Sequence, residues 1–595
     1  MKVRANRWIF IGLFLPMLIL LTSCSGPDEH IWLKSSGWSR AVFLGNTTLN
    51  DPVTMTLDDE GQIYFVLLSS DADRTESFFD VIALDANGLP LWEQNLGEIS
   101  LNRPDTPQII WEDGHLRLFW LDNENLYTLA LDTEGNPLGA ATLLSADIVV
   151  GSYSVAIDDS GGHRLWFAGP RKNPGAYALS SSDGNGEIIS VDPEGIRVQI
   201  RYDHENNLHV AWLQYPLGYG RSKLFYGEYT TETDINAIAP FNVHELSIGP
   251  SNALTGPVMG MDTDEIYVFW TVVMRTGLSA GGVETSYVHF PLGEPARSSL
   301  PKKISVPSDY GSSFETISGS IFNVGERVAL PSVSGFRTTE LEEIMPNPSQ
   351  AGELAIIFRS PMQYLWRKVR DQVNMVYLAQ GEPTSYQPLS FTTELSTSPN
   401  LMNSAEHDLH VTWLEKIEDN WYAVYFASTS PTISETFSHS TGRELGRVFA
   451  QVAFGMLVGI LMAPIAAGIL MIAPLAILFI FSPLRKYSSE RVQDIFSVIS
   501  ILLGIVAVWM GKLAMLPDML GYVPFSAWIP EIPFALAEIL RLGVPVLFSL
   551  LAIFIAWFYT YRQSNKSTLY FILIYVGVDS ALTTAIYAVL IYGAI

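Results

Sequence analysis

The sequence predicts two domains of different kinds: an all-β propeller of about seven four-stranded blades, followed by an α-helical membrane domain of four spans. Two observations carry this prediction. A hairpin pattern of alternating apolar residues recurs through the first two thirds of the chain, and propellers are built from units repeated every 40 to 50 residues or so. Four long apolar stretches then fill the remainder, as expected for helices that cross a bilayer.

Charge is divided between the two regions. Residues 24–442 contain 54 acidic and 23 basic residues, whereas residues 443–595 contain seven acidic and nine basic ones. The acidic field repels phosphates and anionic headgroups, which excludes nucleic acid as a partner. We expect a solvated acidic surface, with a cationic partner or weak Ca²⁺ binding as the alternatives, and no other cofactor.

The first residues have the pattern of a secretory signal. Lys2, Arg4 and Arg7 form a basic segment, and residues 8–21 form an apolar one. About 20 apolar residues are needed to cross a bilayer, so this segment is too short for a membrane span.

Residues 21–24 read Leu-Thr-Ser-Cys and resemble the bacterial lipobox. That resemblance implies cleavage after a signal peptide 1–23, a diacylglycerol-modified Cys24 and a tether over 24–37. Cys24 is the one cysteine of the chain. The alternative is an uncleaved signal anchor, and both interpretations place residue 30 outside the cytoplasmic membrane.

The repeat consists of an apolar alternation, a short turn with Asp, Asn or Gly, and a second alternation that ends in an aromatic residue. Such a pattern predicts a β-hairpin. The copies cover residues 55–65, 110–120, 155–166, 200–212, 258–270 and 401–413, with a degenerate copy at 317–330 that lacks the aromatic residue. A second strand pair follows each hairpin, most clearly at 81–92 and 126–138.

These units resemble blades of the sialidase-like and quinoprotein-like propellers. The closest match is Ala-Leu-Asp-x-x-Gly-x-x-Leu at residues 83–91. The resemblance implies a fold and no particular activity. Residues 182–184 read Ser-Asp-Gly but lack the tryptophan of a sialidase Asp box, which argues against a genuine sialidase. No tryptophan ring for a quinone cofactor is evident.

The hairpins predict seven blades within residues 38–442. We interpret residues 336–370 as an insertion in the sixth blade. Their strand-like stretch 354–358 would raise the count to eight if it began a blade, so six to eight blades remain open. Residues 38–46 are expected to supply the outer strand of the last blade and close the ring.

The predicted spans are residues 448–482, 495–516, 534–560 and 568–594 within a membrane domain 443–595. The first is long and contains two prolines, so it is either one kinked helix or a re-entrant hairpin. Basic residues at 485–491 and 562–566 mark the cytoplasmic loops. With one crossing per stretch, the propeller lies on the outer side, as the signal sequence also indicates.

Four ionisable residues lie within or close to these spans: Lys512, Glu538, Arg541 and Asp579. Glu538 and Arg541 are three residues apart and can pair on one helix face. Intramembrane charge is costly and indicates either a polar pathway, a docking site for a partner, or a network that fixes helix packing. No partner is evident for Asp579.

No catalytic or metal motif stands out, and no catalytic residue or metal ligand is predicted. His209 and His410 occupy the same position of two repeats, which favours packing over metal binding. Residues 58–61 and 158–161 are acidic turns that could hold Ca²⁺ weakly, although hairpin turns use the same residue types.

We therefore interpret the chain as a multi-pass bacterial membrane lipoprotein that acts as a recognition or interaction platform. Its expected partners are membrane lipid and a membrane protein, and the ligand of the propeller is not specified by the sequence. The alternatives are an extracytoplasmic glycan hydrolase or lyase with its site at the propeller axis, and a transport-associated membrane subunit.

Overall fold

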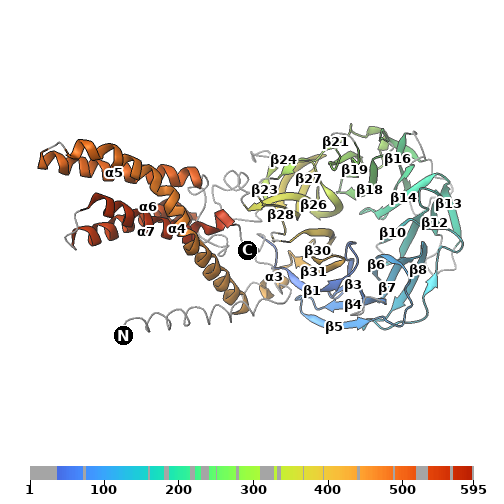
Figure 1. Cartoon of the computed structure of the whole chain (residues 1–595). Coiled ribbons are helices and arrows are strands. Elements are labelled where there is room, and N and C mark those ends of the chain that lie inside the picture. Colours follow the sequence, from blue (N-terminus) through green and yellow to red (C-terminus); the bar gives the residue numbers. More distant parts are fainter. Residues whose placement is uncertain are drawn as a thin grey trace.

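The computed structural model describes residues 37–592 apart from 71–75, 159–160, 180–186, 215–220, 230–239, 250, 277–279, 309–326, 331–336, 351, 366–367, 391, 393, 438–441, 487–488, 517–533 and 563–566. A ring of β-sheets and a bundle of long helices lie side by side (Figure 1). The lipobox and Cys24 lie outside the described residues.

Each of the first five blades is an antiparallel sheet of four strands in chain order. The first two blades are β2 (Met55–Leu57), β3 (Ile63–Ser70), β4 (Ser77–Leu84) and β5 (Pro90–Asn95), then β6 (Pro104–Glu112), β7 (His115–Asp122), β8 (Asn125–Leu131) and β9 (Thr142–Leu143). The third and fourth are β10 (Ser152–Ile157), β11 (His163–Ala168), β12 (Ala176–Leu179) and β13 (Ile188–Asp192), then β14 (Gly195–Tyr202), β15 (Leu208–Gln214), β16 (Ser222–Tyr229) and β17 (Phe241–Leu246). The fifth is β18 (Ala253–Met261), β19 (Glu265–Val273), β20 (Val283–Pro291) and β21 (Lys302–Lys303).

The sixth blade corrects one interpretation of the sequence. Its strands are β25 (Glu342–Gln350), β26 (Glu353–Leu365), β27 (Lys368–Ala379) and β28 (Glu382–Pro388), with β23 (Val328–Ala329) added outside β28. The segment 336–370 is therefore not an insertion, because it forms the first hairpin of the blade. The degenerate copy at 317–330 lies mostly outside the described residues, and its end supplies β23.

The seventh blade closes the ring as expected. Its sheet has the order β1 (Val42–Thr47), β31 (Trp421–Ser428), β30 (Leu409–Glu418) and β29 (Ser396–Asn403). Val42 lies opposite Phe426, and Thr47 lies opposite Tyr422. The described sheets thus form a seven-bladed propeller in which the two ends of the domain are hydrogen-bonded to each other.

The strands are apolar on both faces because each blade packs against two neighbours. Apolar clusters such as that between the sixth and seventh blades fill these junctions. The aromatic residues that end the repeated hairpins are fully buried there: Trp120, Trp166, Trp212 and Trp413. The recurring aromatic residue is therefore a core element of the blade interfaces, which explains its spacing.

Side chains of one blade satisfy the unpaired backbone of the next blade at the axis. The first strand of each blade is a sheet edge, whose amides need partners. Thr56 Oγ1 accepts the amide of Trp111 at 2.9 Å, and Ser154 Oγ accepts that of Ile200 at 3.1 Å. These bonds fix the rotation of one blade relative to the next.

The chain leaves the propeller through the short helix α3 (Pro431–Thr436), which rests on the first blade. Thr432 Oγ1 donates to the carbonyl of Ala86 at 3.2 Å, and Ile433 is buried. Four helices follow: α4 (Gly442–Lys486), α5 (Glu490–Met515), α6 (Phe534–Tyr561) and α7 (Thr568–Tyr592). Continuous α4 contains Pro464, Pro474 and Pro483, so the first stretch is one helix and not a re-entrant hairpin.

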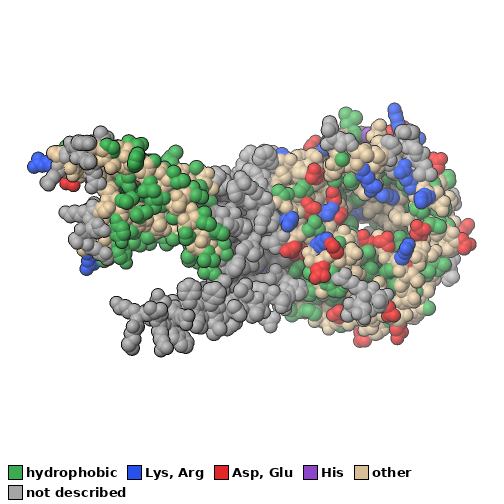
Figure 2. Space-filling model, in the orientation of Figure 1, with side chains coloured by type: hydrophobic (Ala, Val, Ile, Leu, Met, Phe, Trp, Pro, Cys, Tyr) green, Lys and Arg blue, Asp and Glu red, His purple; other side chains and the backbone are tan. Residues whose placement is uncertain are grey.

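All four helices are long and apolar enough to cross a membrane, with candidate spans Met456–Pro483, Arg491–Met515, Ile539–Thr560 and Thr568–Tyr587. Helix α7 lies at the centre of the bundle, since 56% of its most apolar segment is buried, against 17–22% for the corresponding segments of the other three helices. Hydrophobic side chains cover the visible surface of the bundle (Figure 2), as expected for contact with lipid.

Candidate functional site

The first strands of five blades share a β-bulge near their beginning. Each bulge contains a residue with positive φ, from 45° to 97°. These residues are Thr106, Arg197, Gly256, Glu343 and Ser398. We call the five bulges together with residues 50–51 and 105 the axial rim, because they surround one end of the propeller axis. Bulges redirect side chains away from the ladder, here toward the neighbouring blade.

A pair of carboxyl groups lies in the axial rim. Asp51 Oδ2 accepts the amide of Thr106 at 3.2 Å, and its carboxyl group is hydrogen-bonded to that of Asp105. Burial, reinforced by Asp105, raises the pKa of Asp51 to about 7. The neutral form of the Asp51 carboxyl group is therefore favoured up to about pH 7.

Glu343 joins the sixth and seventh blades within the same rim. Its carboxylate accepts the Thr397 hydroxyl at 2.9 and 3.1 Å and the Ser398 amide at 2.5 Å. Ser398 Oγ then donates to the Asn50 carbonyl at 3.0 Å, beside Asp51. Burial raises the pKa of Glu343.

Arg359 adds a cation to this network. It forms an ion pair with Glu342 and lies 3.5 Å from Glu343 and 3.7 Å from Asp371. The rim thus links the sixth, seventh, first and second blades through charged and polar groups. Charged side chains of both signs surround the hollow at the centre of the ring (Figure 2).

The rim has features of a binding surface more than of a glycosidase site. Glycosidase carboxyl groups stand about 5 Å or more apart, whereas those of Asp51 and Asp105 share a hydrogen bond. Tyr153 donates its hydroxyl to the carbonyls of Thr106 and Phe119, the latter at 3.1 Å. Burial keeps the pKa of Tyr153 well above its usual value, so its hydroxyl stays protonated near neutral pH.

Arg201 crosses the axis deeper in the propeller. It is four residues beyond the bulge of β14, or ~13 Å along the strand. Its guanidinium donates to Asn347 Oδ1 at 3.0 Å and to the carbonyl of Pro346, both on β25. Asn347 Nδ2 in turn donates a hydrogen bond to Asn403 Oδ1 at 2.7 Å. Burial lowers the pKa of Arg201 to about 10, so the group stays cationic. These bonds join the fourth, sixth and seventh blades, and no local sequence pattern reveals them.

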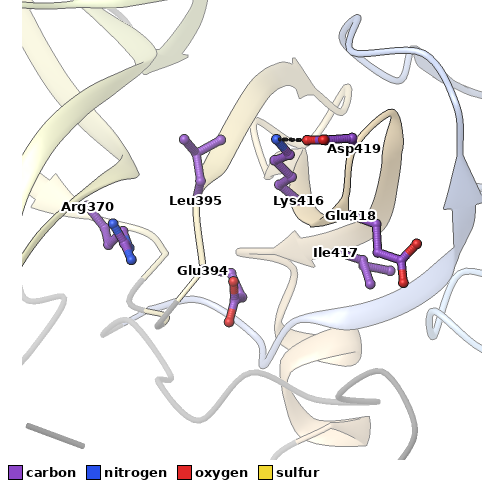
Figure 3. Close-up of a pocket in the computed structure, with 7 residues that line it drawn as sticks. All are labelled: Arg370, Glu394, Leu395, Lys416, Ile417, Glu418 and Asp419. Atoms are coloured by element: carbon purple, nitrogen blue, oxygen red, sulfur yellow. Dashed lines mark hydrogen bonds and ion pairs between the residues drawn. The ribbon is translucent and has the colours of Figure 1, made fainter. Parts of the chain in front are cut away.

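An open cavity of about 650 Å³ lies between the sixth and seventh blades. Figure 3 shows its lining residues, which come from three segments: Arg370, Glu394, Leu395, Lys416, Ile417, Glu418 and Asp419. Lys416 pairs with Asp419 at 2.7 Å. Gln372 holds one wall by donating to the carbonyls of Thr392 and Glu394. The mixed charges give this cavity no clear preference for an ion of either sign.

The structure brings two of the predicted intramembrane residues together. Lys512 Nζ lies 2.8 Å from Asp579 Oδ2, and both side chains are buried. Ser549 Oγ of α6 donates to Asp579 Oδ1 at 2.8 Å. Asp579 therefore has a partner, which the sequence could not reveal because the two residues lie 67 positions apart on different helices.

The other predicted pair is not tested. Arg541 lies in α6 and is partly buried, but the side chain of Glu538 falls outside the described part of the chain. Pairing of Glu538 with Arg541 stays a prediction.

The acidic turn at Asp58 and the first of the two repeated histidines have structural roles in the described regions. Asp58 Oδ1 accepts the amides of Glu60 and Gln62 at 2.9 and 2.8 Å. The His209 ring is hydrogen-bonded on both sides: Nδ1 lies 2.6 Å from the Tyr226 hydroxyl, and Nε2 lies 3.0 Å from Asp203 Oδ2. Within the residues that the structure describes, no three metal-ligating side chains gather. Weak Ca²⁺ binding remains an untested prediction.

Comparisons with known proteins point to similar folds only. The sequence matches no protein-family model and no curated protein sequence. A polysaccharide lyase of the ulvan lyase family PL25 aligns over 68% of this chain and 100% of its own, with 10% identity and a TM-score of 0.43. A Trypanosoma rangeli sialidase aligns over 73% and 61%, with 10% identity and a TM-score of 0.31. A Fusarium graminearum α-L-arabinofuranosidase aligns over 65% and 97%, with 9% identity and a TM-score of 0.34. These are sialidase-like and polysaccharide lyase propellers, and the likeness does not extend to activity.

Proposed function

We propose that this protein is a recognition platform on the outer face of the cytoplasmic membrane, with its ligand bound at the axial rim and a membrane protein bound to its helices. One observation carries the platform role. The paired strands β1 and β31 close the propeller, and the chain continues from β31 through α3 into the membrane helices. The propeller is thus a rigid ring set beside the membrane domain.

Sidedness is supported by the distribution of charge. Exposed Arg491 and Arg562 stand at the helix connections, and basic side chains mark the end of the bundle far from the propeller (Figure 2). Basic loops stay in the cytoplasm, which leaves the propeller outside. A cysteine introduced at exposed Glu134 should react with an impermeant maleimide on intact cells, whereas one at Arg562 should react only after lysis. The reverse pattern would invert the topology.

The membrane partner is testable by purification from native membranes in a mild detergent. Four spans exceed what anchoring requires, so we expect the full chain to co-purify with a membrane protein. A matched preparation should carry Leu461→Trp and Ile465→Trp, on the exposed face of α4, and should lose a partner that docks there. Recovery of a lone monomer under every mild condition would contradict the platform role.

A glycan-active enzyme is the second candidate, favoured by the raised pKa of Asp51 beside Asp105. A carboxyl group that holds its proton near pH 7 can act as a general acid. The test is cleavage of a panel of neutral and uronate polysaccharides by the wild-type protein and by Asp51→Asn. Cleavage that disappears in the variant would favour the enzyme over the platform.

A further inference from the structure

A line of polar side chains follows one face of α7 through the centre of the helical bundle. Tyr575, Asp579, Thr583 and Tyr587 are spaced four residues apart and are nearly or fully buried. We call these residues the α7 stripe. Residues spaced by four share a helix face, and twelve residues rise ~18 Å, more than half of a ~30 Å hydrocarbon core.

Neighbouring helices place their polar groups against this stripe. Lys512 of α5 pairs with Asp579 at 2.8 Å, and its ammonium lies 4.7 Å from the centre of the Trp509 ring. Ser549 of α6 bonds to Asp579. The backbone of α4 at Gly459 packs against α7 at Thr584 and Ala585. The ionisable groups that face Asp579 in the described part of the bundle are Lys512 and Tyr575.

Two hydroxyl groups beside the pair lack partners. Ser580 Oγ and Thr583 Oγ1 are 0% and 4% exposed as residues, and neither has a hydrogen-bond partner among the described atoms. Buried polar groups normally find a partner in protein or ordered water. In a bilayer the surrounding lipid offers none. Water between the helices would supply these missing bonds.

We propose that the Lys512–Asp579 pair and the hydroxyl groups around it form a hydrated site that exchanges a proton with bulk water. In this step a water-borne proton adds to a carboxylate oxygen of Asp579, while the Lys512 ammonium keeps its protons. The charge of the site changes by one, and Lys512 is released from its ion pair. A metal cation would instead have to displace the ammonium, because Lys512 already occupies the carboxylate at 2.8 Å.

Labelling with dicyclohexylcarbodiimide tests the proposal, because this apolar reagent reacts with protonated carboxyl groups. The full-length protein in lipid nanodiscs is treated over a range of pH, and the modified residue is identified by mass spectrometry. We expect Asp579 to be labelled increasingly as the pH falls, by up to about tenfold per unit, the limit for one proton. Asp579→Asn should abolish that adduct.

Two further variants separate exchange from packing. Lys512→Met removes the ammonium, so the neutral acid is favoured in apolar surroundings, and labelling should extend to higher pH. Thr583→Val keeps the shape but removes a hydroxyl, and should slow labelling severalfold without loss of helical circular dichroism. Asp579 could also stay unlabelled at every pH, both in the wild type and in a folded Lys512→Met or Thr583→Val protein. That result would show a structural pair sealed from water and would overturn the proposal. Protection by Na⁺ at constant pH would show a cation site and overturn the proposal.

Discussion

Asp51 ties the stability of the propeller to acidity, because its environment favours the protonated form. Burial, with Asp105 and Glu343 nearby, raises its pKa to about 7, from about 3.9 in an unfolded chain. A raised carboxyl pKa contributes stability that is fully present below the unfolded value and is lost as the pH rises through the folded one. Glu415, buried beside the open cavity, has a pKa raised to about 7 by burial and acts in the same direction.

Asp51 and Glu415 should therefore each contribute a loss of stability between about pH 4 and pH 7. Asp51→Asn removes one titrating group and should reduce that loss by an amount on the order of 2 kcal/mol. Thermal unfolding followed at several pH values measures it. Asp59→Asn, at an exposed turn, is the matched control and should leave the profile unchanged. An unaltered slope in Asp51→Asn would mean that Asp51 ionises normally.

The buried ion pair in the helices should show strong coupling. Removing one partner leaves a lone charge in an apolar core, which costs about 3–5 kcal/mol. Asp579→Leu alone should therefore destabilise the bundle more than Asp579→Leu combined with Lys512→Met. Melting of both variants in the same detergent gives the comparison, and simple additivity would show that the two side chains act independently.

Among elements, the repeated hairpins were foreseeable because burial on both faces and the turn residues leave a local pattern. The sixth blade was misread because β25 contains Pro346 and Pro348, which weaken its strand pattern. The neighbouring degenerate copy at 317–330 looks like the first hairpin of the blade, so the true hairpin looks like an insertion. The axial rim was not foreseeable, because its contacts join bulges of different blades. Likewise, the sequence singles out Asp579 and Lys512 but does not reveal that they pair.

Packing of α4 against α7 depends on Gly459. A Cβ atom there would lie 2.1 Å from the Thr584 carbonyl oxygen, so Gly459→Ala should push the helices apart and lower the melting temperature of the bundle. Gly468, on the same helix, has open space around it. Gly468→Ala should instead be neutral, or stabilise by up to about 1 kcal/mol through helix propensity. Equal effects of both substitutions would contradict the close contact.

Strand β1 should be essential to the ring, because it is the outer strand of the seventh blade. A chain that begins at residue 48 lacks β1, while one that begins at residue 37 keeps it. Behind a common signal sequence, we expect the shorter chain to be cleaved by protease within the propeller and the longer chain to resist. Similar resistance of the two chains would show that the blade holds without its fourth strand.

At the scale of the whole molecule, the lipobox interpretation makes a clear prediction about Cys24. Labelled fatty acid should enter the wild-type protein and should be absent from Cys24→Ser. Both proteins should remain in the membrane after an alkaline wash, because four helices suffice for insertion. Fatty acid that persists in Cys24→Ser would exclude the lipobox interpretation.

The closure of the ring also has a mechanical consequence. Ser39 donates its amide to the Ser428 carbonyl at 2.6 Å, and the Ser428 amide donates to Ser39 Oγ at 3.0 Å. The two chain segments leave the antiparallel pair β1–β31 at this same end. If both are anchored in the bilayer, a force that separates the anchors would pull the pair apart like a zipper, one hydrogen bond at a time. Ser39 and Ser428 would be the first bonds to bear that load, so lateral tension would open the propeller from the side of its anchors.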